Sequence, residues 1–121
     1  MSLPFSASLT ILVPAYNEAE NLPHVLAELA EALPKAATNV EILIVDDGSA
    51  DATPQLLERF CAEGETNQGE SHVRRRFIRH PKNRGLTAAL RTGFAAAEGE
   101  YLTWTPADGQ IPFSELAKIL A

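Results

Sequence analysis

The chain has 121 residues, of which 45% are apolar, and a net charge of −6. This length and composition allow one domain with one ordinary hydrophobic core. The single cysteine, Cys61, excludes an internal disulfide framework, and no His and Cys residues have the spacing of a zinc site. No run approaches the ~20 apolar residues of a membrane-spanning helix, and the N-terminus lacks the features of a signal peptide. The composition therefore predicts a cytoplasmic globular domain.

Two strand–helix units open the chain. Residues 9–13 are a short apolar run ended by Pro14, and residues 40–45 repeat this strand pattern. After the second strand, Asp51 and Pro54 provide a capping residue and a proline suited to the first turn of a helix that continues to Cys61. The apolar face of the first helix comprises Leu22, Val25, Leu26, Leu29 and Leu33.

Two further strands follow. Residues 63–72 are polar and contain glycine, which predicts an exposed loop. Residues 73–78 form the third predicted strand, with a helix over 85–97. Residues 101–105 form the fourth strand, and a last helix begins at Pro112. Residues 1–7 are expected to be a disordered or cloning-derived extension.

Charge is unevenly distributed along these elements. Residues 1–73 carry two basic and twelve acidic side chains, whereas residues 74–121 carry eight basic and four acidic ones. Seven basic residues lie between Arg74 and Arg91, and a basic stripe of this kind attracts phosphate. The other interpretation, which we prefer for Arg74, Arg75 and Arg76, is a solvated strand face.

The alternation of strands and helices predicts an α/β fold with a mainly parallel sheet and helices on both faces, a three-layer α/β/α architecture. In such sheets, the loops that leave the carboxyl ends of the strands meet at one edge, and ligands bind there. We therefore expect the loops after the four predicted strands to form a single site.

The first two of these loops contain carboxylates. Glu18 follows the first strand together with Asn17, which is also a suitable cap for the next helix. Asp46 and Asp47 follow the second strand. Adjacent carboxylates at the end of a buried strand repel one another and need donors, a cation or a ligand. The alternative is a turn formed by the Asp-Gly pair.

The other two loops contain cations and oxygen ligands. Lys82, Arg84 and Gly85 lie at the start of a helix, where backbone N–H groups favour phosphate, although an ordinary Asn/Gly turn has the same residues. Asp108 and Gln110 provide a carboxylate and an amide oxygen two residues apart. Such oxygens suit Mg²⁺ or Mn²⁺.

The remaining aromatic and histidine residues are interpreted as structural. Strand and helix faces predict core packing for Phe77, Phe94 and Trp104. Surface or capping positions are predicted for His24, His72 and His80.

Four stretches together resemble a known family. They are VPAYNEAENL (13–22), ILIVDDGSADAT (42–53), NRGLTAALRTGFAAAEGEYL (83–102) and ADGQ (107–110). In this order they resemble the nucleotide-binding half of family 2 glycosyltransferases with the GT-A fold, in particular the dolichol-phosphate mannose synthase and polyprenyl-phosphate glycosyltransferase branch. The resemblance implies that residues 8–121 form the nucleotide-sugar-binding half of a GT-A domain, with the C-terminal acceptor half absent.

The resemblance also implies a set of site residues. The implied nucleotide-binding residues are Pro14, Tyr16, Glu18, Val45, Asp47, Lys82, Arg84, Gly85 and Ala107. Within this set, Asp47 would accept a hydrogen bond from the base, while Asp46 supports the turn. Tyr16 would border or stack on the base, or would pack near the strand end.

The metal motif departs from the family pattern. The family has Asp-x-Asp followed two residues later by Gln, and Asp108 and Gln110 match the last two positions. Pro106 stands where the first aspartate is expected, and proline has no side-chain oxygen and no N–H. The implied cofactor is Mg²⁺ or Mn²⁺ at a site that lacks one ligand. This departure favours a non-catalytic or degenerate nucleotide-sugar-binding module as the alternative function.

The implied reaction is metal-dependent, inverting transfer of a sugar from a UDP- or GDP-linked donor to a polyprenyl phosphate or saccharide acceptor. The catalytic base is expected beyond Ala121. No nucleic acid is implied as a partner. Peripheral membrane contact through the missing C-terminal part, and a homodimer, are left open.

Two other classes of protein fit less well. A response-regulator receiver domain has a similar length and an acid pair after a strand, but that pair should follow the first strand, and here a complete strand–helix unit precedes it. A dinucleotide-binding oxidoreductase is not supported, because no G-x-G-x-x-G follows a strand.

Overall fold

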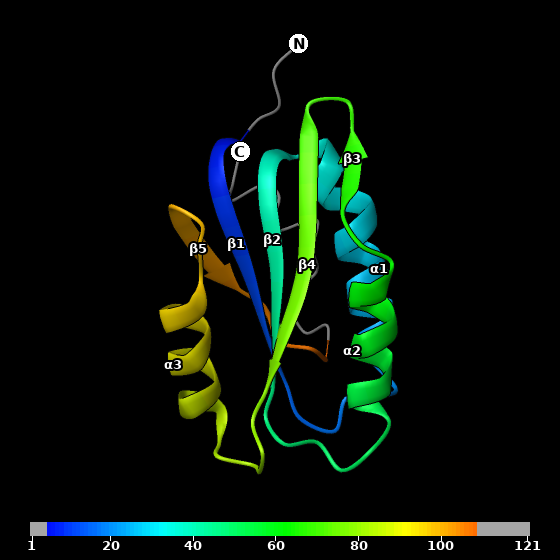
Figure 1. The fold of residues 1–121 in the computed structure, drawn as a ribbon, viewed down its shortest axis with the longest axis vertical. Coiled ribbons are helices and arrows are strands. Elements are labelled where there is room, and N and C mark those ends of the chain that lie inside the picture. Colours follow the sequence, from blue (N-terminus) through cyan, green and yellow to red (C-terminus); the bar gives the residue numbers. More distant parts are fainter. Residues whose placement is uncertain (1–4, 109–121) are drawn as a thin grey trace.

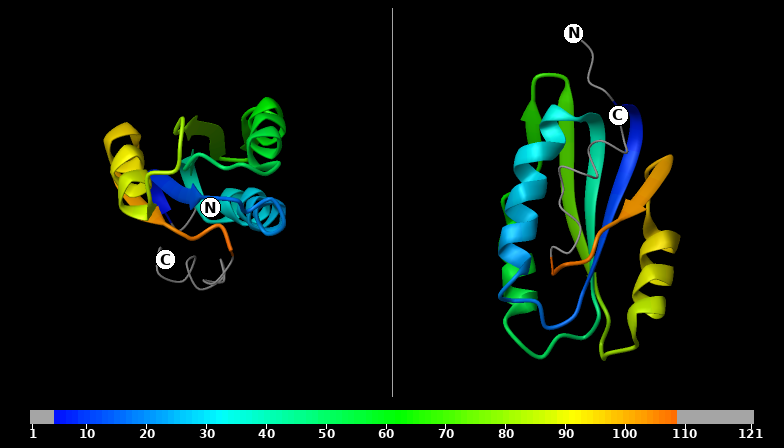
Figure 2. Two further views of the ribbon diagram at one scale, coloured as in Figure 1. Left: turned by 90° about the horizontal axis from the view of Figure 1, so that it is seen from below. Right: turned by 180° about the vertical axis from the view of Figure 1, so that it is seen from behind.

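A computed structural model describes residues 5–108 as one five-stranded sheet with helices on both faces (Figure 1). Helices α1 (Leu22–Ala32) and α2 (Thr53–Ala62) cover one face, and helix α3 (Leu86–Ala96) covers the other (Figure 2). The predicted three-layer α/β/α architecture is confirmed.

The sheet has the strand order β3-β4-β2-β1-β5. Every pair of neighbouring strands is parallel except β3–β4. The strands are β1 (Phe5–Ala15), β2 (Ala37–Asp46), β3 (Thr66–Gln68), β4 (Ser71–Arg79) and β5 (Tyr101–Trp104). Ala15 pairs with Asp46 and Asp46 pairs with Arg79, so β1, β2 and β4 end at the same level.

The helices form where the sequence predicts them. A proline in the first turn of α1 and of α2 suits a position where no backbone N–H donor is needed. Helix α1 buries Leu22, Val25, Leu26 and Leu29, and a short 3₁₀ turn (Leu33–Lys35) follows it. The predicted apolar face of this helix is therefore confirmed.

Two cores lie on the two sides of the sheet. The larger one packs β1 and β2 against α1, and the smaller one packs Leu12, Leu43 and Val45 against α3. Helix α3 lies very close to the sheet, since a Cβ at Gly93 would be 2.3 Å from Leu12 Cδ1. Gly93 therefore sets the separation between α3 and the sheet, and a larger residue there would push the helix away.

Residues 66–68 are a strand rather than part of the predicted loop. They form an antiparallel hairpin with β4, connected by Gly69 and Glu70, and Gly69 has a φ of 60°. A two-residue hairpin turn requires positive φ, which glycine adopts without strain. Gly69 in the sequence is typical of a hairpin turn, but the strand before it, β3, is short and polar.

Two further predictions were wrong. Phe94 and Trp104 are 51% and 39% exposed, because Trp104 lies on β5 at the edge of the sheet and Phe94 lies on the flank of α3. Strand β1 begins at Phe5, so residues 5–7 belong to the sheet rather than to a disordered extension. The helix predicted from Pro112 lies outside the described residues.

Candidate functional site

The loops after β1, β2 and β4 meet at the carboxyl edge of the sheet, below the strands in Figure 1. Strand β5 is parallel to β1 and ends beside Leu12, and Thr105 N then donates to Leu12 O at 3.0 Å. The four segments therefore leave the sheet at one edge, as the sequence predicted.

The loop after β1 is joined to the loop after β2. Asn17 has a φ of 51°, its backbone N–H donates to Ser49 Oγ at 2.9 Å, and its side-chain oxygen accepts from Ala50 N at 2.8 Å. Glu18 N donates to Thr53 Oγ1 at 3.1 Å. The capping role considered for Asn17 was wrong, because its side chain binds another loop.

Asp46 supports the turn after β2. Its Oδ1 accepts hydrogen bonds from Ser49 N at 3.1 Å and from Ser49 Oγ at 2.5 Å, and its Oδ2 lies 3.5 Å from Arg79 Nε. The side chain is completely buried. Asp46 thus has the turn-supporting role that was predicted for it.

The Asp47 carboxylate connects β2 to the loop before α3. Oδ1 lies 2.8 Å from His80 Nδ1 and accepts from Arg84 N at 2.9 Å. Oδ2 accepts from Asn83 Nδ2 at 3.0 Å and from Gly85 N at 2.8 Å. The side chain is only 5% exposed. Because Asp46 and Asp47 point to opposite faces of the sheet, each has its own donors and the predicted repulsion is relieved.

The ionisation of Asp47 follows from these contacts. Burial raises the pKa of its carboxyl, but the hydrogen bonds from His80, Arg84 N and Gly85 N outweigh burial, and the pKa lies below its ordinary value. Asp47 is therefore an anion at neutral pH, held at the start of α3 where the helix dipole favours negative charge.

His80 is buried, contrary to the prediction of a surface or capping residue. Its Nε2 lies 2.7 Å from Thr92 Oγ1 on α3, and its Nδ1 faces Asp47. In the neutral imidazole, Nδ1–H donates to the carboxylate and Nε2 accepts from the hydroxyl. The alternation of faces along β4 could have indicated this burial. His80 follows β4 directly and lies on the face that points toward α3.

Gly48 is required by the contact between two of the loops. Its φ is +72°, and a Cβ at this position would be 2.3 Å from the carbonyl carbon of Lys82 and 2.4 Å from Asn83 N. No side chain fits at that distance. The loops after β2 and β4 can therefore pack against each other only with glycine here.

The loop after β4 combines backbone donors and exposed cations. The N–H groups of Arg84 and Gly85, predicted to favour phosphate, donate to Asp47 in this structure. The side chains of Lys82 and Arg84 are exposed at the edge of the sheet. Diphosphate contact by this loop stays a prediction, and the N–H groups of Arg84 and Gly85 are already bound to Asp47 in this structure.

Three of the four arginines of β4 pair with carboxylates. Arg75 Nη1 lies 2.8 Å from Glu63 Oε2, Arg76 Nε lies 3.1 Å from Glu41 Oε2, and Arg79 pairs with Asp46. The folded sheet thus pairs the basic second part of the chain with the acidic first part. This pairing accounts for Arg75, Arg76 and Arg79 without a phosphate ligand. The solvated position predicted for Arg75 was wrong, because its side chain is only 8% exposed.

The other predicted site residues differ in the solvent exposure of their side chains. Pro14, Val45 and Ala107 are buried, so their side chains belong to the core. Tyr16 is 46% exposed, which excludes core packing for its ring. Asp108 is exposed. Contact of any of these residues with a nucleotide stays a prediction.

The predicted metal ligands are only partly within the described residues. Gln110 lies outside them, and Pro106 has no side-chain oxygen to act as a ligand beside Asp108. Over residues 5–108 no group of three or more His, Cys, Asp or Glu side chains could hold a metal ion. The described residues therefore do not form a metal site by themselves.

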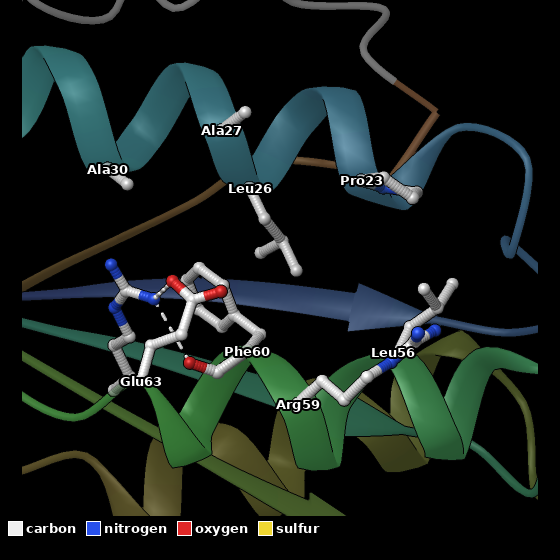
Figure 3. A pocket seen from close by; sticks show the side chains of 9 residues that line it. Pro23, Leu26, Ala27, Ala30, Leu56, Arg59, Phe60 and Glu63 are labelled. Carbon is white, nitrogen blue, oxygen red and sulfur yellow. Dashed lines mark hydrogen bonds and ion pairs between the residues drawn. The ribbon is translucent and has the colours of Figure 1, made fainter.

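An apolar groove lies between α1 and α2, away from these loops. Figure 3 shows Leu26 and Phe60 pointing into it from opposite sides. Its volume is about 400 Å³, and Arg75 at its wall stacks on the Phe60 ring, 4.3 Å from the centroid. No predicted site residue lines the groove, so it is separate from the candidate site.

The sequence of the chain matches the model of a protein family, described as glycosyl transferase family 2, over residues 10–121. The chain belongs to this family. Membership excludes the receiver-domain and oxidoreductase interpretations. The resemblance inferred from the four motifs is confirmed.

Two curated relatives of this family-2 chain are named for polyprenyl-phosphate chemistry. Human dolichyl-phosphate beta-glucosyltransferase is 34% identical, and the match covers 92% of this chain and 34% of the relative. Undecaprenyl-phosphate 4-deoxy-4-formamido-L-arabinose transferase of Pseudomonas fluorescens (strain SBW25) is also 34% identical, with 93% and 31% covered. The chain spans about a third of the length of these relatives.

Two solved structures have the same fold. The mannosyltransferase PcManGT from Pyrobaculum calidifontis, in complex with GDP-Man and Mn²⁺, superposes with a TM-score of 0.75 at 27% identity, covering 95% of this chain and 32% of that one. TarS from S. aureus in complex with UDP-GlcNAc gives a TM-score of 0.59 at 26% identity, covering 84% and 26%. The family-2 chain therefore forms part of a GT-A fold.

Proposed function

We propose that this chain is the donor-binding half of an inverting glycosyltransferase that transfers a sugar from a UDP- or GDP-linked donor to a polyprenyl phosphate or saccharide acceptor. The observation that carries the proposal is the joining of three loops around Asp46 and Asp47 at the carboxyl edge of the sheet. The family match supports it. The names of the two curated relatives support a polyprenyl phosphate as the acceptor.

Each loop contributes a different property to the proposed site. Asp47 would accept a hydrogen bond from the base, and the exposed ring of Tyr16 would border the base. Lys82 and Arg84 would attract the diphosphate, because their exposed cations lie at the start of α3, where the helix dipole also favours anions. The residues proposed to line the nucleotide pocket are Pro14, Tyr16, Glu18, Val45, Asp47, Lys82, Arg84, Gly85 and Ala107.

The proposed site includes a divalent cation. Asp108 would provide one oxygen ligand, and Gln110 would provide a second. A bound Mg²⁺ or Mn²⁺ would offset the charge that develops on the leaving diphosphate. Because Pro106 provides no third ligand, the remaining positions would be filled by the diphosphate and water.

This single-carboxylate arrangement also favours the second candidate function. A degenerate module would bind the nucleotide sugar through the loops around Asp47 and lack transfer activity, since Pro106 removes a metal ligand. The two candidates share the donor site and differ in whether a metal strengthens binding there.

Isothermal titration of the chain with UDP and with GDP, each with and without Mn²⁺, tests both candidates. We expect one of the nucleotides to bind, and we expect Pro106→Asp to increase its affinity about tenfold with Mn²⁺ and not at all without it. An affinity that does not respond to Mn²⁺ in either protein would favour the degenerate module. The absence of binding in both proteins would contradict the donor site.

The proposal also includes where the enzyme meets its acceptor. Within residues 5–108 no helix is long and apolar enough to cross a bilayer. A polyprenyl phosphate is a membrane lipid, so an enzyme using it would meet its acceptor at a membrane surface. A cytoplasmic location, that membrane contact and a homodimer stay predictions.

A further inference from the structure

One of the donors that face the Asp47 carboxylate differs from the others in its position. Asn83 Nδ2, Arg84 N and Gly85 N come from the loop before α3, where the side chains of Asn83 and Arg84 are exposed. His80 directly follows β4 and is only 4% exposed. Among the donors that residues 5–108 provide to Asp47, His80 is therefore the one buried side chain.

The His80 residue is fixed through three contacts to three elements. Its backbone N–H donates to Asp46 O at 2.8 Å, at the end of β2. Its Nδ1 lies 2.8 Å from Asp47 Oδ1, and its Nε2 lies 2.7 Å from Thr92 Oγ1 on α3. Because the ring is buried and bonded at both nitrogens, it has little freedom to rotate.

Thr92 supports the protonation state that the contact with Asp47 requires. Asp47 is an anion at neutral pH, so it accepts the hydrogen bond and Nδ1 carries the hydrogen. The lone pair of Nε2 then accepts from the Thr92 hydroxyl. Thr92 directly precedes Gly93, which lies against Leu12 of the sheet. The packing of α3 on the sheet, and not the exposed loop, therefore places this hydroxyl.

We propose that His80 is a positioning residue for nucleotide binding, because its Nδ1–H holds the Asp47 carboxylate in place and Thr92 holds the imidazole ring. The inference rests on the proposed donor-binding function, in which Asp47 accepts from the base, and adds two residues that act through Asp47. A binding group that is held in one orientation before the ligand arrives gives a higher affinity than one that must be ordered on binding.

A purely structural role for His80 makes a different prediction. A link between β4 and α3 through Thr92 would change the free energy of unfolding and leave the nucleotide affinity of the folded protein unchanged. In the positioning role, affinity depends mainly on the donor at Asp47 Oδ1. A variant that keeps this donor and loses the ring therefore separates the two roles.

His80→Asn and His80→Leu provide this separation. The amide nitrogen of asparagine replaces Nδ1 as a donor, leucine has no donor, and both lose the contact with Thr92. In calorimetric titrations with UDP and with GDP, we expect the Kd of the nucleotide that binds to rise at least about tenfold in His80→Leu and less than about threefold in His80→Asn.

Two outcomes of this titration are distinguishable. A rise in Kd in His80→Leu that is no larger than the rise in His80→Asn would overturn the positioning role and leave the donor-binding function standing. Binding of neither nucleotide by the unmodified chain would overturn both.

His72→Leu is the matched control. His72 also faces a carboxylate, since its Nε2 lies 3.2 Å from Glu65 Oε2, but it lies at the opposite end of β4. The same substitution there should leave the Kd unchanged. A rise as large as in His80→Leu would mean that the loss of either histidine weakens binding, and would overturn the interpretation.

The role of Thr92 is tested by Thr92→Val and Thr92→Ser. Valine keeps the shape of the side chain and removes the hydroxyl, whereas serine keeps the hydroxyl. Because valine leaves the buried Nε2 without a donor, we expect it to raise the Kd about threefold to tenfold, and we expect serine to leave it unchanged. Equal Kd values in the two variants would overturn the role assigned to Thr92.

The ¹⁵N NMR signals of the His80 ring test the geometry in the unmodified chain, so this test does not depend on the folding of any variant. At about pH 8, where imidazole is neutral, we expect the hydrogen to be on Nδ1 both without and with the nucleotide. A neutral ring that carries its hydrogen on Nε2 cannot donate to Asp47 and would overturn the proposal.

Discussion

Glu41 in strand β2 and Asp47 just after that strand are two buried carboxylates that face α3, one near each end of the helix. Asp47 accepts the N–H groups of Arg84 and Gly85, just before the helix begins. Glu41 accepts from Glu98 N at 2.8 Å, just after the helix ends, and from Thr10 Oγ1 at 2.7 Å. The same functional group thus binds backbone N–H groups beside both ends of α3.

The two carboxylates lie beside opposite ends of the α3 dipole, so the electrostatic potential around them differs in sign. A helix N-terminus favours an anion and a C-terminus opposes one, so Asp47 needs no full cation whereas Glu41 does. Arg76 meets that need, since its Nε lies 3.1 Å from Glu41 and its other end binds Ala96 O and pairs with Glu98. Glu41 is therefore paired with a cation inside a hydrogen-bonded network. Asp47 instead accepts from the exposed side chain of Asn83, in one of the loops of the proposed nucleotide site.

The largest effect is expected for Asp47→Asn. The amide would direct its NH₂ group at donors that now bind a carboxylate, so we expect the free energy of unfolding to fall by about 4 kcal/mol. Binding of UDP should also be lost. Urea denaturation and calorimetric titration measure the two effects. Retained UDP binding in the folded variant would show that Asp47 serves only the helix, as Glu41 does.

Gly48→Ala tests the contact that places Asp47 beside the loop before α3. Positive φ and a Cβ 2.3 Å from the Lys82 carbonyl carbon should together cost about 3 kcal/mol. The control is Gly64→Ala, which has a similar φ of +79° but nothing within 4 Å, so only the strain of about 1 kcal/mol remains. Equal losses in the two variants would show that the loop contact is not tight.

Glu41→Gln should have a smaller effect, confined to stability. The amide keeps the shape of the side chain but weakens its contacts with Arg76 and Thr10, which lowers the free energy of unfolding by about 2 kcal/mol. UDP affinity should be unchanged, because this network is closed to ligands. A loss of affinity as large as in the Asp47 variant would remove the distinction between the two carboxylates.

The smallest effect concerns pH. Burial raises the pKa of Glu41, but hydrogen bonds from Glu98 N, Arg76 and Thr10 outweigh it, and the pKa lies below the ordinary 4.5. A lowered native pKa stabilises the protein above that ordinary value, and the stabilisation is lost as the pH falls through the native pKa.

We therefore expect a constant difference in unfolding free energy between wild type and Glu41→Gln from about pH 7 to 5, and a smaller difference below about pH 4. Urea denaturation at a series of pH values measures it. A difference that stays the same down to pH 3 would contradict the lowered pKa.

Most of the fold could be predicted because it follows from local patterns. The apolar runs, the prolines at helix starts and the alternation of strand and helix were sufficient for the layers and for the shared edge. The β3 hairpin was missed because its strand is three residues long and polar. Phe94 and Trp104 were misplaced because an apolar residue at an edge strand or helix flank has the same local pattern as a core residue.

The candidate site was predictable as a set of loops, but the partners within it were not. Local patterns place Asp47 and Arg84 after parallel strands, so their arrival at one edge follows from chain order. His80 was taken for a surface residue because histidine after a strand is usually exposed. Its contacts with Asp47 and Thr92 join three separate elements, and such contacts have no short-range signature.

By itself, the sequence determined the layers, the shared edge and the family, because periodicity and motif spacing are properties of neighbouring residues. Only the tertiary structure decided that the Asp47 carboxylate faces four donors and that Arg75, Arg76 and Arg79 pair with carboxylates from elsewhere in the chain. Hydrogen-bond saturation and charge pairing depend on distances between distant segments, and those distances exist only in the folded chain.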